Sequence, residues 1–249
     1  MANTFSQIRM GLAGISFALA GSAAQAINIT LPTTNLDAEA VFSFGEDAAN
    51  AMSVVGLSVS ALGNTRAIAG SDWQFMMPVT EVSLNMSLLP LKLSPISGEA
   101  SGSGLLIGRT AGSLALSNFS LDFKRNVMMA DLSTSRGVMA QYDVFNFGVS
   151  EGLHLSTSGG LSMAMNLNNM MLTDGAQLQF ASALRLNKIE RALLPQLNFG
   201  SLQIDIAPSL RFDVSATPYV ASVPEVPTLV MMGLGMLGMA FLSRRRMTG

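Results

Sequence analysis

The sequence predicts an all-β protein: an antiparallel β-sandwich or barrel-like body with one or two short helices, followed by a C-terminal membrane helix. Three observations lead to this class. Short segments alternate apolar with small or polar residues, which is the period-2 pattern of half-buried strands. Turn residues separate these segments at the spacing typical of sandwiches and barrels. Of the 249 residues, 49% are hydrophobic and only 12% are charged.

The N-terminal segment Met1–Ala26 has the features of a secretory signal. Arg9 provides the positive charge before an apolar run of glycine, leucine, alanine, isoleucine and phenylalanine. Ala24 and Ala26 form the small-residue pattern that precedes cleavage, which predicts a mature chain starting at Ile27. We therefore expect an exported protein.

Period-2 alternation predicts about ten short strands along the body. The clearest is the one beginning at Val82, where four apolar residues alternate with serine and asparagine. The expected strands are Val41–Gly45, Val54–Leu62, Trp73–Met77, Val82–Leu88, Leu105–Gly108, Ser113–Ser117, Phe119–Phe123, Val127–Leu132, Val138–Val149, Leu202–Ile206 and Leu210–Val214.

Turns and irregularities are expected at four places. Gly152–Leu167 predicts a hairpin around a Ser-Gly-Gly turn. The apolar residues before and after Asn118 have opposite parity, which predicts a bulge or turn there. Ser97–Gly104 is rich in glycine and serine and is expected to be a long loop within one domain. Two flanking prolines are expected to confine Leu91–Leu93 to an edge or a loop.

Two short helices are expected inside the body. Glu46–Met52 begins with two acids, which suit the positive end of a helix dipole. Ser182–Leu194 places apolar residues on one face and basic residues on the other. Ser182 is its expected N-cap, and Pro195 follows its end.

The composition argues against an enzyme. There is no cysteine, so disulfides, thiolate metal sites and cysteine nucleophiles are excluded, and His154 is the only histidine. Gly148–Gly152 matches the G-x-S-x-G nucleophile elbow around Ser150, but that motif requires a following helix. The residues that follow are predicted to form a strand, and His154 is too near in sequence to act as an independent third element.

Neither a metal nor a cofactor is predicted. A weak calcium site stays open as an alternative, although no D-x-D-x-D-G loop is present. The carboxylates closest together are Asp37 with Glu39, Glu46 with Asp47, and Asp205 with Asp213 on adjacent predicted strands.

The charge balance excludes a nucleic-acid partner, because the body is acidic and has no basic cluster. Only four of the 14 basic residues, Arg9 and the three near the C-terminus, lie outside the body. Aromatic residues are few, so a ligand site would need several of them in one concave surface. The candidates for such a site are Trp73, Tyr142, Phe145 and Phe147.

The C-terminal stretch has three parts in a fixed order. Val223-Pro224-Glu225-Val226-Pro227 cannot be helical, because each proline removes a donor and biases its predecessor towards extended geometry. Thr228–Leu242 is apolar and uncharged, and Arg244, Arg245 and Arg246 follow it. An apolar run closed by arginines predicts a short membrane helix with a cytoplasmic C-terminus.

These three parts together resemble the PEP-CTERM sorting signal of exosortase systems. The resemblance covers about the last 27 residues, and the family's usual Pro-Glu-Pro appears with Val226 inserted before the second proline. It implies that an exosortase removes the signal from a protein held transiently in the inner membrane, usually in bacteria that make exopolysaccharide. The residues that carry the signal would be Val223, Pro224, Glu225, Arg244, Arg245 and Arg246. A permanent tail anchor is the alternative.

The body resembles, more distantly, a group of exported bacterial β-rich domains. The matching pieces are Gly56–Val59, Pro78–Leu84 and Ser103–Leu106. Some relatives of that group are surface haem-transport domains, which bind haem through a tyrosine and a histidine. Tyr142 and His154 do not match that motif, so the resemblance does not extend to haem binding.

The chain thus divides into a signal peptide (1–26), a β-rich exported domain (27–216), and a tether with the sorting signal (217–249). The first functional hypothesis is a non-catalytic protein of the cell surface or extracellular matrix, linked to exopolysaccharide or biofilm and processed by an exosortase. The alternative is a periplasmic or surface binding module for a glycan or haem, with a permanent C-terminal anchor.

Overall fold

The computed structural model describes residues 26–88, 91–156 and 162–221. Ile27, the predicted first residue of the mature chain, begins the first strand. Ala24, the sorting-signal residues and the apolar segment Thr228–Leu242 lie outside the described residues. Within the described ranges, no helix is long and apolar enough to cross a membrane.

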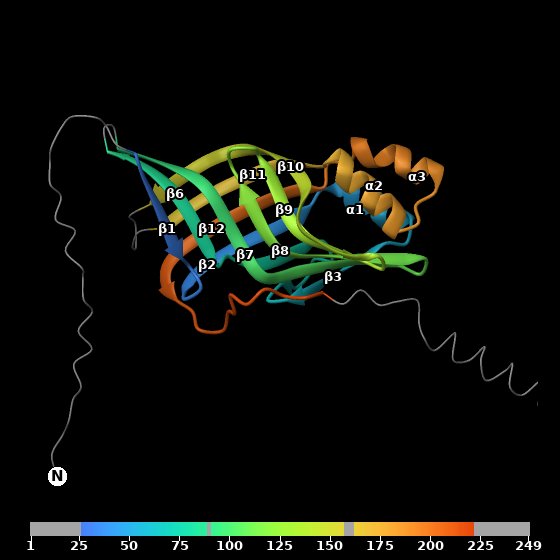
Figure 1. Cartoon of the computed structure of the whole chain (residues 1–249), viewed down its shortest axis with the longest axis horizontal. Helices are drawn as coiled ribbons and strands as arrows, with labels where there is room; N and C mark the ends of the chain where they lie inside the picture. Colours follow the sequence, from blue (N-terminus) through green and yellow to red (C-terminus); the bar gives the residue numbers. More distant parts are fainter. Residues whose placement is uncertain (1–25, 89–90, 157–161, 222–249) are drawn as a thin grey trace, which may run out of the picture.

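The body is one antiparallel sheet that curls on itself, where a sandwich would have two sheets (Figure 1). Its strands follow the order β1-β6-β7-β8-β9-β10-β11-β12-β2-β5-β4, and β3 pairs with β7. The strands are β1 (Ile27–Pro32), β2 (Leu36–Phe44), β3 (Ser58–Gly63), β4 (Arg66–Ala67), β5 (Gln74–Pro78), β6 (Glu81–Leu88), β7 (Leu91–Arg109), β8 (Gly112–Asp122), β9 (Val127–Thr134), β10 (Gly137–Ser156), β11 (Ser162–Leu172) and β12 (Gly200–Leu210).

Three short α-helices lie together at one end of the curled sheet (Figure 1). α1 (Glu46–Val54) follows β2 and confirms the helix predicted there. α2 (Asp174–Ala183), α3 (Lys188–Leu193) and the 3-10 helix η1 (Leu194–Gln196) connect β11 to β12.

The single helix predicted for Ser182–Leu194 is wrong, because the chain breaks between α2 and α3. Arg185 has a φ of 51°, in the left-handed region. Asn187 then begins α3 with a capping box: its side chain accepts two backbone N–H groups, and Glu190 accepts the Asn187 N–H. The side chain of Thr173 caps α2. The spacing of Asn187 and Glu190 is a signal that the sequence does carry.

Replacing Asn187 by alanine is expected to lower the free energy of unfolding by about 1 kcal/mol, since α3 loses its N-cap. Chemical denaturation measures this loss. Ser182→Ala is the matched control, because Ser182 lies in the last turn of α2 and caps no helix; its expected effect is near zero. Equal losses in the two variants would contradict the capping assignment.

The loop predicted for Ser97–Gly104 is also wrong, because these residues lie within β7. Small residues are needed there for close packing: a Cβ on Gly104 would lie 2.9 Å from the carbonyl oxygen of Leu116. Gly102 has a φ of 79° and marks an irregularity in the ladder with β8. Leu91–Leu93 pairs with β6 alone, which confirms the predicted edge position.

The irregularity predicted near Asn118 is confirmed. Asn118 has a φ of 52°, and the register between β8 and β9 shifts around it. An asparagine tolerates this left-handed conformation better than most residues. The shift turns Phe119 and Leu121 to the interior, on the same side as the leucines that precede Asn118.

Where two final strands are predicted, only one forms. β12 continues through Pro208 to Leu210, with a register shift against β2 between Ala207 and Leu210. The strand predicted for Leu210–Val214 is wrong. Residues 211–221, which we call the strap, instead cross the outside of the sheet without joining a ladder (Figure 1).

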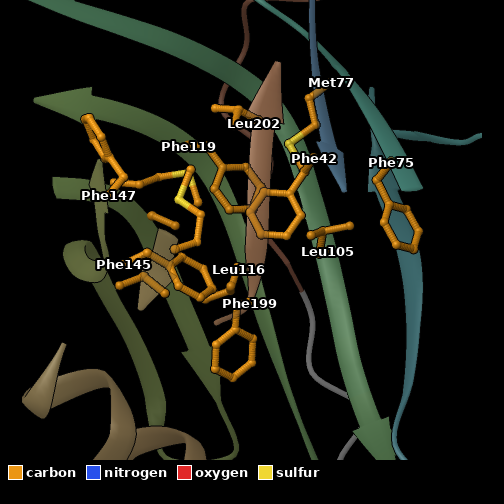
Figure 2. Packing of buried hydrophobic residues seen from close by; sticks show 14 of the residues in the cluster. Phe42, Phe75, Met77, Leu105, Leu116, Phe119, Phe145, Phe147, Phe199 and Leu202 are labelled. Atoms are coloured by element: carbon orange, nitrogen blue, oxygen red, sulfur yellow. The ribbon is translucent and has the colours of Figure 1, made fainter. Parts of the chain in front are cut away.

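The hydrophobic core fills the inside of the curl (Figure 2). Phe42 of β2 is 1% exposed and packs edge-on against Phe44, with ring centroids 4.8 Å apart. Phe145 lies 5.9 Å from Phe42 and 5.5 Å from Phe199, which precedes β12. This chain of rings continues the core of the sheet into the helical end.

Candidate ligand-binding site

The four aromatic residues predicted as ligand contacts do not meet at one concave surface. Phe145 and Phe147 are 2% and 6% exposed and belong to the core. Trp73 packs edge-on against a core phenylalanine, with centroids 5.9 Å apart. Tyr142 lies over the start of α2, where its hydroxyl is 2.5 Å from the position of a Cβ on Gly175. Among the described residues these side chains therefore stabilise the fold separately.

The elbow-like motif lies within a strand. β10 passes through Ser150 and His154 without a turn, so the helix that a nucleophile elbow requires does not follow the serine. The Ser150 hydroxyl donates to the carbonyl of Asn166 on β11, at 3.1 Å. His154 is exposed and pairs with Ala164 on the same neighbouring strand.

The predicted carboxylate pair Asp37 and Glu39 lies on the outer face of β2, beside Arg211 of the strap. Burial raises the pKa of the Glu39 carboxyl, and the neighbouring Asp37 charge raises it further, while Arg211 opposes both. No group of three or more histidine, aspartate or glutamate side chains among the described residues is arranged to hold a metal ion.

A cavity of about 190 Å³ lies between the helices and the end of the sheet. Ile107, Phe180 and Leu184 line it and are each at most 2% exposed. Val54 of α1 and Leu193 of α3 also line it but are 87% and 45% exposed, so they mark its entrance. We call this space the helix-end cavity. Its other walls include Met52, Leu57, Leu186, Leu194, Leu197 and Phe199.

Close backbone contacts place α1 beside the start of β12 and so set the width of the helix-end cavity. The N–H of Gly45, just before α1, donates to the carbonyl of Phe199 at 3.1 Å. A Cβ on Gly45 would lie 2.8 Å from the carbonyl oxygen of Asn198. Gly200 has a φ of 124°, and a Cβ there would overlap the carbonyl of Ser43. Both positions therefore require glycine, because the neighbouring backbone leaves no room for a side chain.

An ion pair involves one lining residue of the helix-end cavity, Glu190. Arg109, at the end of β7, lies 3.2 Å from Glu190 of α3, and both side chains are 15% exposed. Arg109 also donates to the carbonyls of Leu184 and Arg185, at 2.8 and 2.6 Å. The Asn187 N–H and the Arg109 guanidinium lower the pKa of the Glu190 carboxyl. Glu190, the one charged residue among the described lining residues, is therefore an ionised carboxylate whose charge is already paired with Arg109.

A second apolar space, of about 50 Å³, lies further along the interior of the curled sheet. Side chains such as Phe119, Leu121, Met163 and Met165 line it. Its volume is about a quarter of that of the helix-end cavity. The helix-end cavity is the larger of the two and the better candidate for a ligand site.

No protein-family model matches the chain, and no curated protein sequence does. Two solved structures are similar to it over part of its length. The C-terminal domain of HtaA from Corynebacterium glutamicum matches over 69% of this chain and 97% of its own, with 13% identity and a TM-score of 0.43. The heme binding protein HtaB from the same organism matches over 75% and 98%, with 8% identity and a TM-score of 0.44.

Proposed function

We propose that the chain is an exported binding module and not an enzyme, and that the helix-end cavity takes a small apolar molecule or the apolar end of a larger one. The observation that carries the proposal is the size and lining of this cavity, about 190 Å³ between α1, α2, α3 and β7. An engineered apolar cavity of about 150 Å³ in another protein binds benzene. Pockets for whole drug-sized ligands measure about 300–1,000 Å³, so a single ring or a short alkyl chain is the group that fits.

The other ligands considered, a glycan and haem, suit this cavity less well. Sugar hydroxyls need hydrogen-bond partners, and the carboxylate of Glu190 is already occupied by Arg109 and Asn187. Haem iron is held by histidine, cysteine, methionine or tyrosine. Met52 supplies the one such side chain among the described residues that line the cavity. An apolar group needs none of these partners.

For the ends of the chain we propose the roles that the sequence predicts. Met1–Ala26 directs export, and the PEP-CTERM-like stretch around Pro224 and Glu225 is recognised by an exosortase. Thr228–Leu242 holds the protein in the membrane until then, and the binding module afterwards belongs to the cell surface or the exopolysaccharide matrix. The intact mass of the protein from its native host tests this: processed chains should begin at Ile27 and end near Pro224.

Ligand binding is tested by titrating the protein with benzene and with short alkanols, using NMR chemical shifts of the α1 and α2 amides. Ala51→Phe places a ring in the cavity, because Ala51 lines it from α1. This variant is expected to weaken binding of both probes at least tenfold. Ala192→Phe is the matched control, since Ala192 is exposed on α3 and is not among the lining residues; it should bind as the wild type does.

The alternative ligands are tested in the same way. Haem binding is measured by absorption spectroscopy, and binding of a panel of oligosaccharides is measured by calorimetry. Saturable haem or glycan binding that Ala51→Phe leaves unchanged would move the site away from the helix-end cavity and overturn the proposal. Failure of every apolar probe to shift the α1 and α2 amides would also overturn it.

A further inference from the structure

The strap is bound to the body at three points, and the first is Arg211. Its guanidinium donates to backbone carbonyls of Thr33 and Thr34 before β2, Ala38 within β2, and Val79 between β5 and β6. Burial among these backbone carbonyls lowers the pKa of Arg211, while Glu39 and Asp37 oppose that effect. One side chain thus joins the start of β2 to the end of β5.

The second point is the turn between β3 and β4. Asn64 in this turn donates its side-chain N–H to the carbonyl of Ser215 at 2.7 Å. Gly102 of β7 lies directly beneath: a Cβ there would be 2.9 Å from the Ser215 carbonyl oxygen and 3.0 Å from that of Thr217. The strap therefore approaches the sheet at a place where only glycine leaves room for it.

The third point is Asn118, which is 7% exposed. Its side-chain oxygen accepts the N–H groups of Gly102, at 3.0 Å, and Tyr219, at 2.8 Å. Its side-chain nitrogen donates to the carbonyl of Tyr219, at 3.0 Å, and to the carboxylate of Asp131, at 2.7 Å. The side-chain amide of Asn118 thus makes all four of the hydrogen bonds that it can make. Two of them bind the N–H and the carbonyl of Tyr219 in the strap.

These contacts lie across the seam of the curled sheet, by which we mean the place where β3 and β4 lie next to each other without strand pairing. β3 is joined to β7 and β4 is joined to β5, but no ladder joins β3 to β4 among the described residues. The strap begins on the β2–β5 side, crosses the β3–β4 turn at Asn64 and ends on β8 at Asn118. It therefore bridges the two sides that the ladders leave unconnected.

We propose that Asn64, Gly102 and Asn118 form a peptide-binding cradle whose occupant is the chain's own strap, and that the bound strap closes the seam of the sheet. The cradle recognises the backbone of the strap, because its contacts are made to carbonyl and N–H groups of Ser215, Thr217 and Tyr219. This inference is independent of the ligand proposed for the helix-end cavity.

Hydrogen–deuterium exchange of the full chain tests the proposal. Asn118→Gly keeps the left-handed backbone and removes the side chain, so the amides of residues 215–221 and of the β3–β4 turn should exchange about tenfold faster or more. Amides of β11 and β12 should be unchanged. Asn169→Gly is the matched control, because Asn169 also has a positive φ, 53°, but is exposed on β11.

Two further variants separate recognition of the backbone from recognition of side chains. Tyr219→Pro removes the N–H that Asn118 accepts and should release the strap as Asn118→Gly does. Val220→Ala changes a side chain that is 84% exposed and should leave exchange unchanged. The proposal is overturned if wild-type strap amides exchange as fast as those of an unstructured peptide. It is equally overturned if Asn118→Gly accelerates all strands alike, because the effect would then be general loss of stability.

Discussion

Replacing Phe42 by alanine is expected to lower the free energy of unfolding by about 3–5 kcal/mol. Phe42 is 1% exposed and lies where β2 meets the ring of Phe145 from β10, 5.9 Å away between centroids. Truncation removes the transfer free energy of the ring and leaves a cavity that the stiff sheet cannot close. Domains of ordinary stability unfold with about 5–15 kcal/mol, so this one change removes a large share.

Urea denaturation followed by circular dichroism measures this loss. Phe212→Ala is the matched control, because it removes the same ring from the strap, where Phe212 is 81% exposed. Its expected effect is within about 0.5 kcal/mol of zero, as for most surface substitutions. Comparable losses in both variants would mean that the interior of the curl is not the main source of stability.

Strands such as β2 and β12 were predictable because they have one buried and one exposed face. In β2 and β12 the buried residues alternate strictly, for example Ala38, Ala40 and Phe42 against Leu202, Ile204 and Ile206. This alternation arises because successive side chains of a strand point to opposite faces of the sheet, so it can be read from the sequence of the strand alone. The parity change at Asn118 has the same origin, which is why the bulge was predictable as well.

The curl and the strap were not predictable from alternation. Gly102 and Gly104 occur in a stretch whose composition is typical of a loop, but their role is to let β7 pass close to β8 and to the strap. That role depends on what approaches from elsewhere in the chain, and a local pattern contains no such information. The strap was misassigned for the same reason, since the partners of Arg211 lie more than 130 residues away in the sequence.

The candidate site was the least predictable part. Its walls come from α1, β7 and the α2–η1 segment, and the predicted aromatic contacts pack separately in the fold. One local signal pointed to this end of the molecule: the Asn187–Glu190 capping box, which places the break between α2 and α3. The geometry of the cavity depends further on how closely the backbones before α1 and before β12 approach each other.

Gly200→Ala tests that dependence and is expected to lower the free energy of unfolding by about 2–6 kcal/mol. The φ of 124° is a conformation that alanine adopts only at a cost of about 1–3 kcal/mol. The added Cβ would also overlap the backbone of Ser43 and Phe44, and overpacking typically costs about 1–3 kcal/mol more. Denaturation measures the loss in stability. Gly70→Ala provides the comparison, because Gly70 also has a positive φ, 84°, but has open space around it.

The two variants separate strain from crowding. Gly70→Ala should lose only the conformational part, about 1–2 kcal/mol. Relief of the crowding at Gly200 requires the segment before β12 to move away from the turn before α1, and that movement widens the helix-end cavity between α1 and Phe199. Gly200→Ala should therefore weaken benzene binding as well as stability, while Gly70→Ala leaves binding unchanged, because neither Gly70 nor its chain neighbours line the cavity. Equal losses in both variants would show that the close approach of the two backbones does not shape the cavity.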